Sequence, residues 1–484
     1  MYLGIDLGTS AIKAVLVDEH ANVVAEGSLP LAISRPKPNW SEQNAADFWG
    51  GVCSVIDIFA REYGSALAKV RGIGLSGQMH GAVLLDANDV PVRPVILWND
   101  GRAALECNAL ARDFPDLAMI TGVQAMPGFT APKLSWLAKN EPQNFAKIRS
   151  ILLPKDFLRL KLAGVKATDM SDAAGTWWLD EAKRKWSEAA LDATDTKLSQ
   201  LPALLEGNQP SGILLPALAA RWGMPKQVIV AGGAGDAAAG AVGLGAIKDG
   251  DAFISLGTSG QLFVATKSYR PAPATMVHAF AHALPDTWLQ MAAMLNGASP
   301  LAWGAELFGM TPGTLTDAAE AGFDGPGAVQ FLPYLSGERT PHNNPDAKGV
   351  FFGMTSNTGH AALGQYILEG VAYSFADAYK AVLDAGTKIT QAGVIGGGSR
   401  SKFWMQILSN VLNIQLIRYM GADKGPAFGA ARLARLAVTC EDPYTVCIPP
   451  QILDVTTPQE HLVEAYLPKI AQFRRLYQAL KTEF

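Results

Sequence analysis

Leu7-Gly8-Thr9-Ser10 and Leu256-Gly257-Thr258-Ser259 are the same tetrapeptide, and each copy follows a short apolar run that is typical of a strand. A turn of small residues offers backbone N–H groups and hydroxyls to an anion, and no large side chain blocks the approach. One copy alone is typical of an ordinary hairpin turn. Two copies, one in each half of the chain, predict two related lobes that grip a phosphate chain between them.

The first copy lies in a predicted β-hairpin. An apolar strand ends at Asp6, the small-residue turn follows, and a second apolar strand runs from Ala11 to Val17 with Lys13 among its apolar residues. The carboxylate of Asp6 therefore lies at the mouth of the turn. A carboxylate in that place can hold Mg²⁺ next to phosphate oxygens.

Length and composition favour a two-domain α/β enzyme. The 484 residues exceed what one hydrophobic core usually supports, and 49% of them are hydrophobic against 17% that are charged. A formal net charge of -4 gives no basic field to collect nucleic acid. We find neither a signal-peptide pattern nor an apolar run of about 18 residues, so we expect a cytoplasmic protein that does not enter the membrane.

The cysteines and histidines do not favour a disulfide framework or a zinc site. The cysteines lack C-x-x-C spacing, so we expect free thiols in the core at Cys53, Cys107, Cys440 and Cys447. His278 and His282 have the spacing of a metal pair on a helix. No H-E-x-x-H motif accompanies them, and the prolines around them favour extended chain.

Strand and helix patterns alternate along the chain, which predicts an α/β fold with mostly parallel or mixed sheets. Strands are predicted at 70–75, 151–153, 228–231 and 252–256. Helices are predicted at 45–63, 314–321 and 362–383, with a last amphipathic helix after Pro468. The best domain boundary lies within 243–251, where a small-residue helix ends and a fresh strand leads into the second tetrapeptide.

Asp236 is the strongest catalytic candidate. It stands between the glycine-rich 232–235 and the alanine-rich 237–239, where small neighbours let a substrate come close to the carboxylate. The same position suits a helix N-cap, because Asp between a glycine loop and an alanine run is a favoured cap. A cap and a general base are both open, and both can hold together.

Two further stretches carry polar or glycine-rich motifs. Gly396-Gly397-Gly398-Ser399 follows a strand pattern and precedes a helix, which suits a nucleotide near a helix N-terminus. It matches neither the dinucleotide fingerprint nor the P-loop motif. Glu338 and Arg339 lie in a turn-rich segment, where we favour a salt-bridged loop brace over catalysis.

Taken together, these motifs resemble the FGGY family of carbohydrate kinases over nearly the whole chain. The resemblance rests on residues 4–10, 76–81, 98–102, 169–176, 230–240, 255–260, 337–341, 348–353 and 396–399. It implies the two-domain actin-like, ribonuclease-H-like ATPase fold with a central cleft. Residues 1–246 would form the N-terminal domain and residues 247–484 the C-terminal domain.

The resemblance implies ATP and Mg²⁺ as cofactors and a small sugar as the substrate. The residues implied to contact ATP are Gly8, Thr9, Ser10, Lys13, Gly257, Thr258, Ser259, Gly397, Gly398 and Asn410. The residues implied to contact the sugar are Met79, His80, Asp100 and Arg102. Asp236 is implied to be the general base, and Asp6 and Asp236 are implied to lie beside Mg²⁺.

The implied reaction is the transfer of a phosphoryl group from ATP to a sugar hydroxyl, with the C5 hydroxyl of D-xylulose as the expected acceptor. Many relatives have Asn after the base, whereas this chain has Ala237, and a lost polar contact can retune substrate choice. Ribulose, glycerol and gluconate therefore stay open as substrates. A sugar-independent actin-like ATPase is the alternative from another class, and the sequence leaves a monomer and a homodimer both open.

Overall fold

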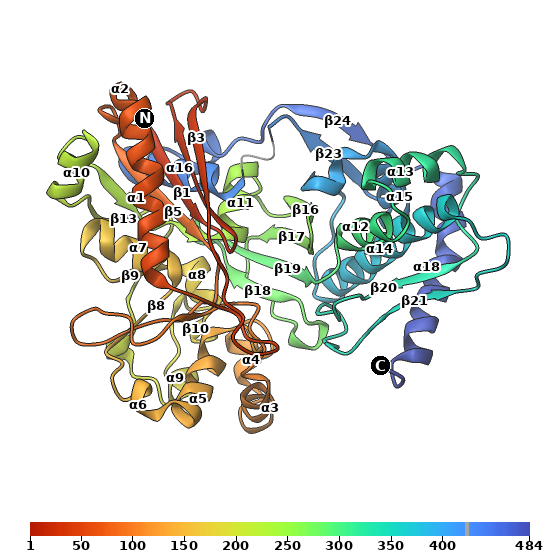
Figure 1. Cartoon of the computed structure of the whole chain (residues 1–484), viewed down its shortest axis with the longest axis horizontal. Helices are drawn as coiled ribbons and strands as arrows, with labels where there is room; N and C mark the ends of the chain where they lie inside the picture. The colour runs from red at the N-terminus through yellow and green to blue at the C-terminus, as the bar shows by residue number, and fades with distance from the viewer. Residues whose placement is uncertain (422–424) are drawn as a thin grey trace.

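Two seven-stranded sheets organise the chain, one in each half (Figure 1). The structure is a computed structural model and describes residues 1–421 and 425–484. Strands and helices alternate in both halves, which confirms the α/β prediction. Among the described residues, no helix is both long enough and apolar enough to cross a membrane.

The first sheet is built around the predicted hairpin. Strands β1 and β2 pair antiparallel, in a register that puts Asp6 opposite Lys13, and β5 runs parallel to β1 on its other side. The sheet order is β13-β14-β5-β1-β2-β3, and β15 also pairs with β5. The strands are β1 (Tyr2–Leu7), β2 (Ala11–Val17), β3 (Val23–Pro30), β5 (Gly72–Gly77), β13 (Pro210–Ile213), β14 (Ile229–Ala231) and β15 (Ala234–Gly235).

The second sheet repeats the first, strand for strand. Its order is β18-β19-β17-β16-β22-β23-β24, in which β16 pairs antiparallel with β17 and parallel with β22, as β1 does with β2 and β5. The outer pairs have matching directions as well, and β18 is an added edge strand. The strands are β16 (Ala252–Leu256), β17 (Gly260–Thr266), β18 (His278–Ala281), β19 (Trp288–Met294), β22 (Gln391–Ile395), β23 (Gln415–Tyr419) and β24 (Ile452–Thr456).

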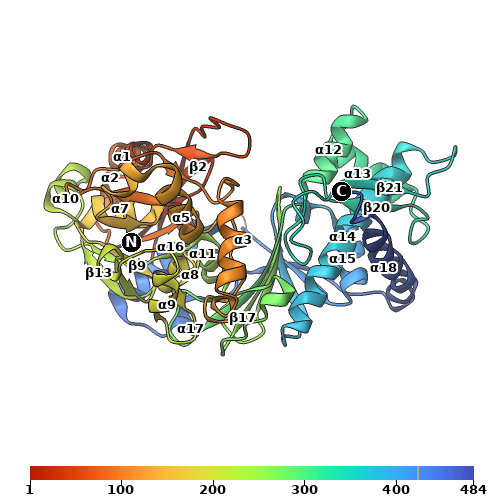
Figure 2. The ribbon, with the colours of Figure 1, turned by 90° about the horizontal axis from the view of Figure 1, so that it is seen from below.

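Helices cover both faces of the first sheet. Helices α1 (Ala45–Glu62) and α7 (Pro154–Ala163) pack on the face to which Leu3 and Ile5 point. Helix α16 (Gly425–Thr439) packs on the opposite face, and α11 (Asp236–Leu244) lies against α16. Although α16 is distant in sequence, Figures 1 and 2 show it among the N-terminal elements.

The contact between α16 and the first sheet is backbone on backbone. A Cβ atom added to Gly74 would stand 1.8 Å from the carbonyl oxygen of Ala430, and one added to Gly4 would stand 1.9 Å from that of Ala427. A Cβ on Gly429 would meet a carbonyl oxygen of α11 at 1.8 Å. Glycine at these positions lets the sheet, α16 and α11 approach one another closely.

The remaining helices are mostly short, apart from α14, which packs on the second sheet, and α18, which packs on α14, α15 and β20. They are α2 (Gly64–Leu67), α3 (Ala104–Asp113), α4 (Leu117–Ile120), α5 (Thr130–Asn140), α6 (Pro142–Phe145), α8 (Met170–Ala174), α9 (Glu188–Asp192), α10 (Pro216–Trp222), α12 (Ser299–Leu307), α13 (Pro312–Ala321), α14 (His360–Asp384), α15 (Lys402–Leu412), α17 (Pro443–Val446) and α18 (Glu460–Leu480). Three short 3₁₀ helices lie at Leu198–Gln200, Pro273–Thr275 and Gly397–Arg400.

Five small two-stranded sheets complete the fold. Their pairs are β4 (Glu42–Gln43) with β7 (Val95–Ile96), β6 (Val83–Leu85) with β8 (Ser150–Leu152), β9 (Ala167–Asp169) with β12 (Ala203–Leu205), β10 (Leu179–Asp180) with β11 (Lys185–Trp186), and β20 (Gln330–Pro333) with β21 (Gly349–Phe352).

The predicted strands and helices are confirmed to within two residues at their ends, with one exception. The last helix begins at Glu460, so the prediction that it follows Pro468 is wrong, and this proline lies inside α18. A proline there removes one backbone hydrogen bond, but the helix also buries Leu462 and Tyr466 before it. That burial extends the helix toward its N-terminus.

Two minor expectations have mixed outcomes. His278 begins the strand β18, which confirms extended chain rather than a helical metal pair. The cysteines are free, as predicted, but Cys440 is exposed rather than in the core. It stands just past the end of α16, where the chain turns with a positive φ of 54°.

We predict that Gly74→Ala destabilises the protein by about 3 kcal/mol or more, because the added methyl would overlap a backbone carbonyl of α16 that cannot move away alone. Thermal denaturation measures this change. Gly50→Ala is the matched control, since Gly50 lies within α1 and an added Cβ would meet nothing within 4 Å. The free energy of unfolding of the control variant should rise by about 0.5–1 kcal/mol, because alanine favours a helix interior over glycine. Equal stability of the two variants would contradict the close packing.

Candidate active site

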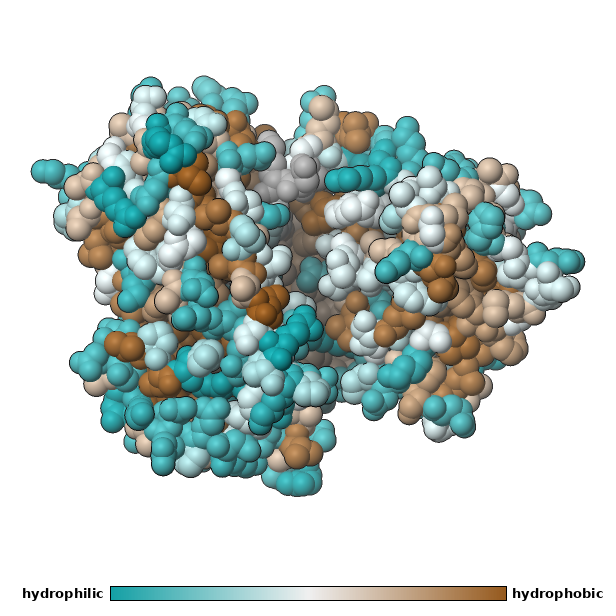
Figure 3. Space-filling view, viewed as in Figure 1, coloured by the Kyte–Doolittle hydropathy of each residue, from teal (hydrophilic) through white to brown (hydrophobic). Residues whose placement is uncertain are grey.

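A cavity of about 670 Å³ lies between the two halves, in the hollow that Figure 3 shows. Asp236 and Ala237 of α11 line it from the first half, and Ser255 of β16 and Ile395 of β22 line it from the second. Arg432 of α16 also reaches its wall. The volume is in the range of small-molecule sites, so a nucleotide-sized ligand fits between the sheets.

Two carboxylates meet at the floor of the first half. Asp6 is the last residue but one of β1, so the predicted end of this strand is one residue short, and Asp6 is buried. Its Oδ1 accepts a hydrogen bond from Ser76 Oγ at 3.0 Å. Burial raises the pKa of Asp6 to about 6. Burial, together with the negative charge of Asp6, raises the pKa of Asp236 to about 7. A carboxyl with a pKa near neutral pH is suited to proton transfer.

Asp236 is the first residue of α11 and not its N-cap. Gly235 occupies the cap position, so the cap hypothesis is wrong by one residue. The Oδ1 atom of Asp236 nevertheless accepts the N–H of Ala237 at 2.7 Å. Within residues 1–421 and 425–484, its Oδ2 atom has no hydrogen-bond partner, so this oxygen is available to a ligand.

The two carboxylates fit a divalent cation that arrives with phosphate. Carboxylate oxygens are preferred ligands of Mg²⁺, and Asp6 Oδ2 faces the small-residue turn, within 4.0 Å of where a Cβ on Gly8 would stand. In the described part of the chain, no group of three or more acidic, histidine or cysteine side chains could hold a metal. Two carboxylates alone make an incomplete cation site, and phosphate oxygens or water would complete it.

The first small-residue turn is joined to two other motifs through Thr9. The Thr9 hydroxyl donates to Gln78 Oε1 at 3.2 Å and accepts from Trp98 Nε1 at 2.9 Å. Gln43 Nε2 donates to the carbonyl oxygen of Thr9 at 2.8 Å. These contacts connect the turn to residues 76–81 and 98–102, so the three motifs form one wall of the site.

The second and third glycine turns lie against each other at the end of the second sheet. A Cβ on Gly396, whose φ is +92°, would stand 2.6 Å from the carbonyl carbon of Leu256 and 2.8 Å from the nitrogen of Gly257. Thr258, Ser259 and Gly397 are exposed. The structure therefore brings together two predicted nucleotide-binding turns, both at the edge from which β16 and β22 reach the cavity.

Met79 lies directly against the loop that carries Asp236, and His80 lies against Gly175 at the end of α8. A Cβ on Gly235 would stand 2.8 Å from Met79 Sδ, and one on Gly175 would stand 2.6 Å from His80 Nδ1. Glycine at these two positions thus leaves room for the two predicted sugar-contacting side chains. The predicted sugar residues and the predicted base share one corner of the molecule.

His80 is held in one orientation. Its Nδ1 lies 2.7 Å from the carbonyl oxygen of Gly175, and its own carbonyl accepts hydrogen bonds from Thr130 Oγ1 and Lys133 Nζ. Burial lowers the pKa of His80 well below its ordinary value, so the ring is neutral. We assign the proton to Nδ1 because it faces a carbonyl, and Nε2 is then an acceptor for a ligand hydroxyl.

Asp100 and Arg102 are engaged with protein partners. Asp100 accepts the N–H of Ser41 at 2.6 Å and forms a bidentate pair with Arg102. The guanidinium of Arg102 also contacts Glu42 at 2.7 Å and stacks 3.5 Å from the centre of the Trp40 ring. These contacts tie the segment before β4 to the wall near Trp98, so both residues shape this wall.

Two predicted ATP contacts lie in different surroundings. Lys13 is exposed on β2, opposite Asp6 across the hairpin. Asn410 is buried on α15, where its Oδ1 accepts the N–H of Gln459 at 2.8 Å and the side chain of Gln406 at 3.0 Å. Asn410 therefore joins α15 to the start of α18.

Arg339, which the sequence analysis assigns to a salt-bridged loop brace, lies beside the wall that carries Trp98. Glu338 does brace the loop, since its carboxylate accepts the N–H of Leu295 at 2.6 Å, but it forms no salt bridge with Arg339. Among the described residues, the guanidinium of Arg339 has no hydrogen bond or ion pair, and it lies 5.4 Å from the centre of the Trp98 ring. Burial is the main cause of the lowered pKa of His80, and the positive charge of Arg339 lowers it further by a smaller amount.

A second feature that the sequence did not reveal is a group of fully buried charged residues behind the Asp236 loop. Lys155, Asp156 and Arg159 of α7, with Asp169 and Asp172 around α8, are all inaccessible to solvent. Residues 169–176 are one of the motifs of the sequence analysis, but nothing in the neighbouring sequence indicates that α7 supplies the ion-pair partners of Asp169 and Asp172. Their spacing alone is typical of a solvated helix face.

Family models match both halves of the chain. The N-terminal domain of the FGGY family of carbohydrate kinases matches residues 1–243, and its C-terminal domain matches residues 252–438.

Individual relatives match over the full length. The chain is 47% identical to a xylulose kinase of Escherichia coli (strain K12) over 482 residues, which cover 99% of each protein. It is 45% identical to a xylulose kinase of Klebsiella pneumoniae, again over 99% of each. The crystal structure of a xyloylose kinase from Brucella ovis superposes with a TM-score of 0.97 at 47% identity and 100% coverage of both chains. These likenesses confirm the predicted actin-like, ribonuclease-H-like fold, and the chain belongs to the FGGY family of carbohydrate kinases.

Proposed function

We propose that this chain phosphorylates D-xylulose at its C5 hydroxyl with ATP and releases D-xylulose 5-phosphate and ADP. The observation that carries the proposal is the position of Asp236, which lines the cavity between the sheets and whose loop also packs against Met79. One carboxylate thus stands where a nucleotide site and a sugar site adjoin. The full-length likeness to xylulose kinases supports D-xylulose as the substrate.

The chemistry assigned to Asp236 is general base catalysis. Its Oδ2 accepts the proton of the sugar hydroxyl, and the hydroxyl oxygen then forms a bond to the γ-phosphorus of ATP. The bond from that phosphorus to the bridging oxygen breaks, and ADP leaves with the electron pair. Residues on both sides of Asp236 are small, so the hydroxyl and the phosphate can approach in line.

The two Gly-Thr-Ser turns are proposed to hold the phosphates from opposite sides. Residues 8–10 and 257–259 end strands at corresponding places in the two sheets, and both turns leave N–H groups free of bulky side chains. Lys13, Gly397, Gly398 and Asn410 are the further proposed contacts on the ATP side. Mg²⁺ held by Asp6 and Asp236 would neutralise charge on the β- and γ-phosphates.

The sugar is proposed to lie between Met79-His80 and the cavity. His80 Nε2 accepts a hydrogen bond from a sugar hydroxyl, and Arg339 offers guanidinium N–H donors from the second half. Asp100 and Arg102 keep the neighbouring wall in place. The side chain of Ala237 contributes no polar contact, so discrimination between ketoses depends on the hydrogen bonds from the other sugar-side residues. We also propose that the two large sheets close over both substrates to exclude water, with α16 moving together with the first sheet, and that the reaction takes place in the cytoplasm, where ATP is available.

A coupled assay for ADP release tests the function. We expect release that depends on added sugar, with the highest kcat/KM for D-xylulose among xylulose, ribulose, glycerol and gluconate. A higher kcat/KM for another sugar would replace D-xylulose as the proposed substrate but would still support sugar kinase activity. ATP hydrolysis that is indifferent to all of them would favour the sugar-independent ATPase instead.

The base assignment predicts that Asp236→Asn lowers kcat by about 10²–10⁴-fold, because the amide cannot accept the hydroxyl proton. Steady-state kinetics with D-xylulose measure the loss. Asp57→Asn is the control, since Asp57 on α1 is a partially exposed partner of Arg221 and does not line the cavity. Full turnover by the Asp236 variant would remove the base from the mechanism.

The raised pKa of Asp236 predicts that the same variant is more heat-stable at high pH. The pKa of Asp236 is about 7 in the folded protein against 3.8 for an unperturbed aspartate, so the wild type loses stability as the pH rises between these two values. The amide of the Asp236→Asn variant does not ionise, so this contribution to the free energy of unfolding does not change with pH. In Mg²⁺-free buffer we expect the Tm of Asp236→Asn to exceed that of the wild type by about 2 °C or more at pH 8 and by less at pH 5. A Tm difference that does not change with pH would contradict the raised pKa.

A further inference from the structure

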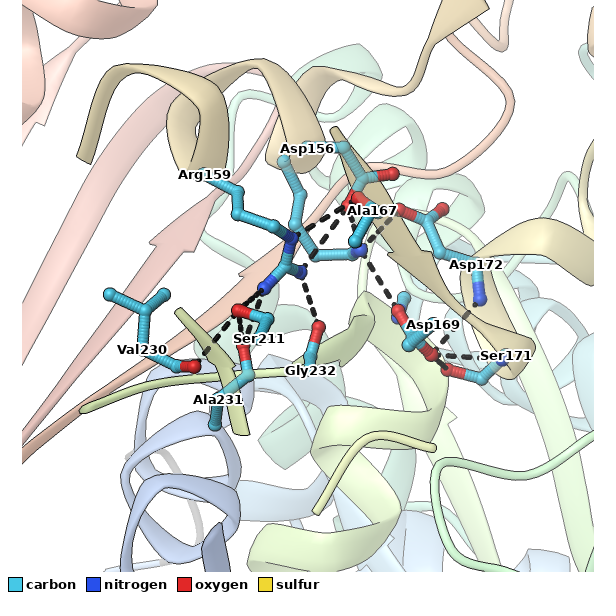
Figure 4. A network of polar contacts seen from close by, with 12 residues as sticks. Asp156, Arg159, Ala167, Asp169, Ser171, Asp172, Ser211, Val230, Ala231 and Gly232 are labelled. Atoms are coloured by element: carbon cyan, nitrogen blue, oxygen red, sulfur yellow. Dashed lines mark hydrogen bonds and ion pairs between the residues drawn. The ribbon is translucent and has the colours of Figure 1, made fainter. Parts of the chain in front are cut away.

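The loop from Ala231 to Asp236 rests on the buried charged residues behind it (Figure 4). We call Lys155, Asp156, Arg159, Asp169 and Asp172 the buried cluster. None of these side chains reaches the cavity, and none has a part in the chemistry proposed above. The question is why the fold buries five ionisable groups at this place.

Arg159 uses its donors on the first part of the loop. Its Nη1 donates to the carbonyl oxygen of Ala231 at 2.5 Å and to Ser211 Oγ at 2.6 Å, and its Nη2 donates to the carbonyl oxygen of Gly232. Its Nε donates to the carbonyl oxygen of Ala167 at 3.1 Å. The planar guanidinium thereby fixes two successive loop carbonyls with respect to α7 and β9.

Ser171 holds the last part of the loop. Its hydroxyl donates to Asp169 Oδ2 at 2.5 Å and accepts the N–H of Gly235 at 3.1 Å. Gly235 is the residue before Asp236, so this hydrogen bond acts one peptide away from the carboxylate. Asp169 also caps α8 by accepting the N–H of Ser171 at 2.9 Å, which fixes the hydroxyl itself.

Lys155 organises the carboxylates that support these contacts. Its Nζ lies 2.6 Å from Asp156 Oδ1, 2.9 Å from Asp169 Oδ1 and 3.2 Å from Asp172 Oδ2. Burial raises the pKa of Asp172 well above its ordinary value, and the nearby Lys155 opposes that shift. Lys155 thus joins the carboxylates of α7 to those at the start of α8.

The opposite side of the loop is fixed too. Strand β15 pairs in parallel with β5, so Ala234 lies beside Ser76 and Gly235 beside Gly77. The side chain of Met79 fills the space next to Gly235. Apolar packing could support the sheet at less desolvation cost, but it would remove the guanidinium donors from the carbonyls of Ala231 and Gly232. It would also remove the Asp169 acceptor that orients the Ser171 hydroxyl toward the Gly235 N–H. The cluster therefore provides directional contacts that apolar side chains cannot.

We propose that Arg159 and Ser171 are positioning residues that set the direction of the Asp236 carboxylate toward the sugar hydroxyl. The inference rests on the proposed role of Asp236 as the base. Neither residue touches a substrate, and each acts through the backbone of the loop. A displacement of about 1 Å at a catalytic group can cost about a hundredfold in rate, so small losses of support are measurable.

Ser171→Ala tests the proposal, because it removes the acceptor for the Gly235 N–H and the donor to Asp169. We expect kcat per nucleotide-binding site to fall about 10–100-fold, while the KM for D-xylulose and the binding of ATP stay within about twofold. Arg159→Lys keeps the charge but cannot reach all five partners of the guanidinium, and it should show the same pattern. Ser374→Ala is the matched control, since Ser374 is a buried serine of α14 whose hydroxyl donates to Val371.

A double-mutant cycle separates positioning from general damage to the fold. In the Asp236→Asn background, Ser171→Ala should change the residual kcat by less than about twofold, since no carboxylate is left to aim. An equal loss in both backgrounds, or an unchanged kcat in the wild-type background, would overturn the positioning role. The single variant Asp236→Asn reports separately on the base, because full activity there would remove the proposed function and not only this inference.

Discussion

Direct backbone contact between α16 and the first sheet is the constraint on which the site depends. Gly4 and Gly74 admit the carbonyls of α16 to the sheet surface, and Gly429 admits α11 to α16. Helix α11 begins with Asp236, so its approach to the sheet fixes where the carboxylate stands. Any side chain between these layers would move the helix away from Asp6. The distance between the two carboxylates is thus a product of glycine packing.

The duplicated tetrapeptide indicated two related lobes, and the structure extends that relation to two whole sheets. Alternating apolar runs of β-branched and small residues identified the strands, and the spacing of Phe48, Val52, Val55, Ile56 and Phe59 identified α1. The hairpin also placed Asp6 within one residue of the end of β1. These features are local, because strand period, helix period and turn chemistry are written in neighbouring residues.

Features that depend on distant partners could not be predicted. Arg159 looks like a solvated helix residue until Ala231 and Gly232 fold over it, and the free guanidinium of Arg339 is visible only once Trp98 lies beneath it. Asn410 followed from the resemblance alone, and its engagement with Gln459 depends on where α18 begins. In each case the partner lies far along the chain, so periodicity carries no information about it. The motifs located the site, whereas the supports behind it needed the tertiary structure.

The place of α16 also bears on how the protein is made. The first sheet comes from the N-terminal half, yet the helix that covers one of its faces ends only at Thr439, after every strand of the two large sheets except β24 has been synthesised. On the ribosome, the face that holds Tyr2, Val15 and Val17 therefore stays uncovered while the second half emerges. The two halves cannot fold as independent units in order of synthesis. Their completion is joined in time, and the catalytic corner forms only when nearly all of the second sheet is in place.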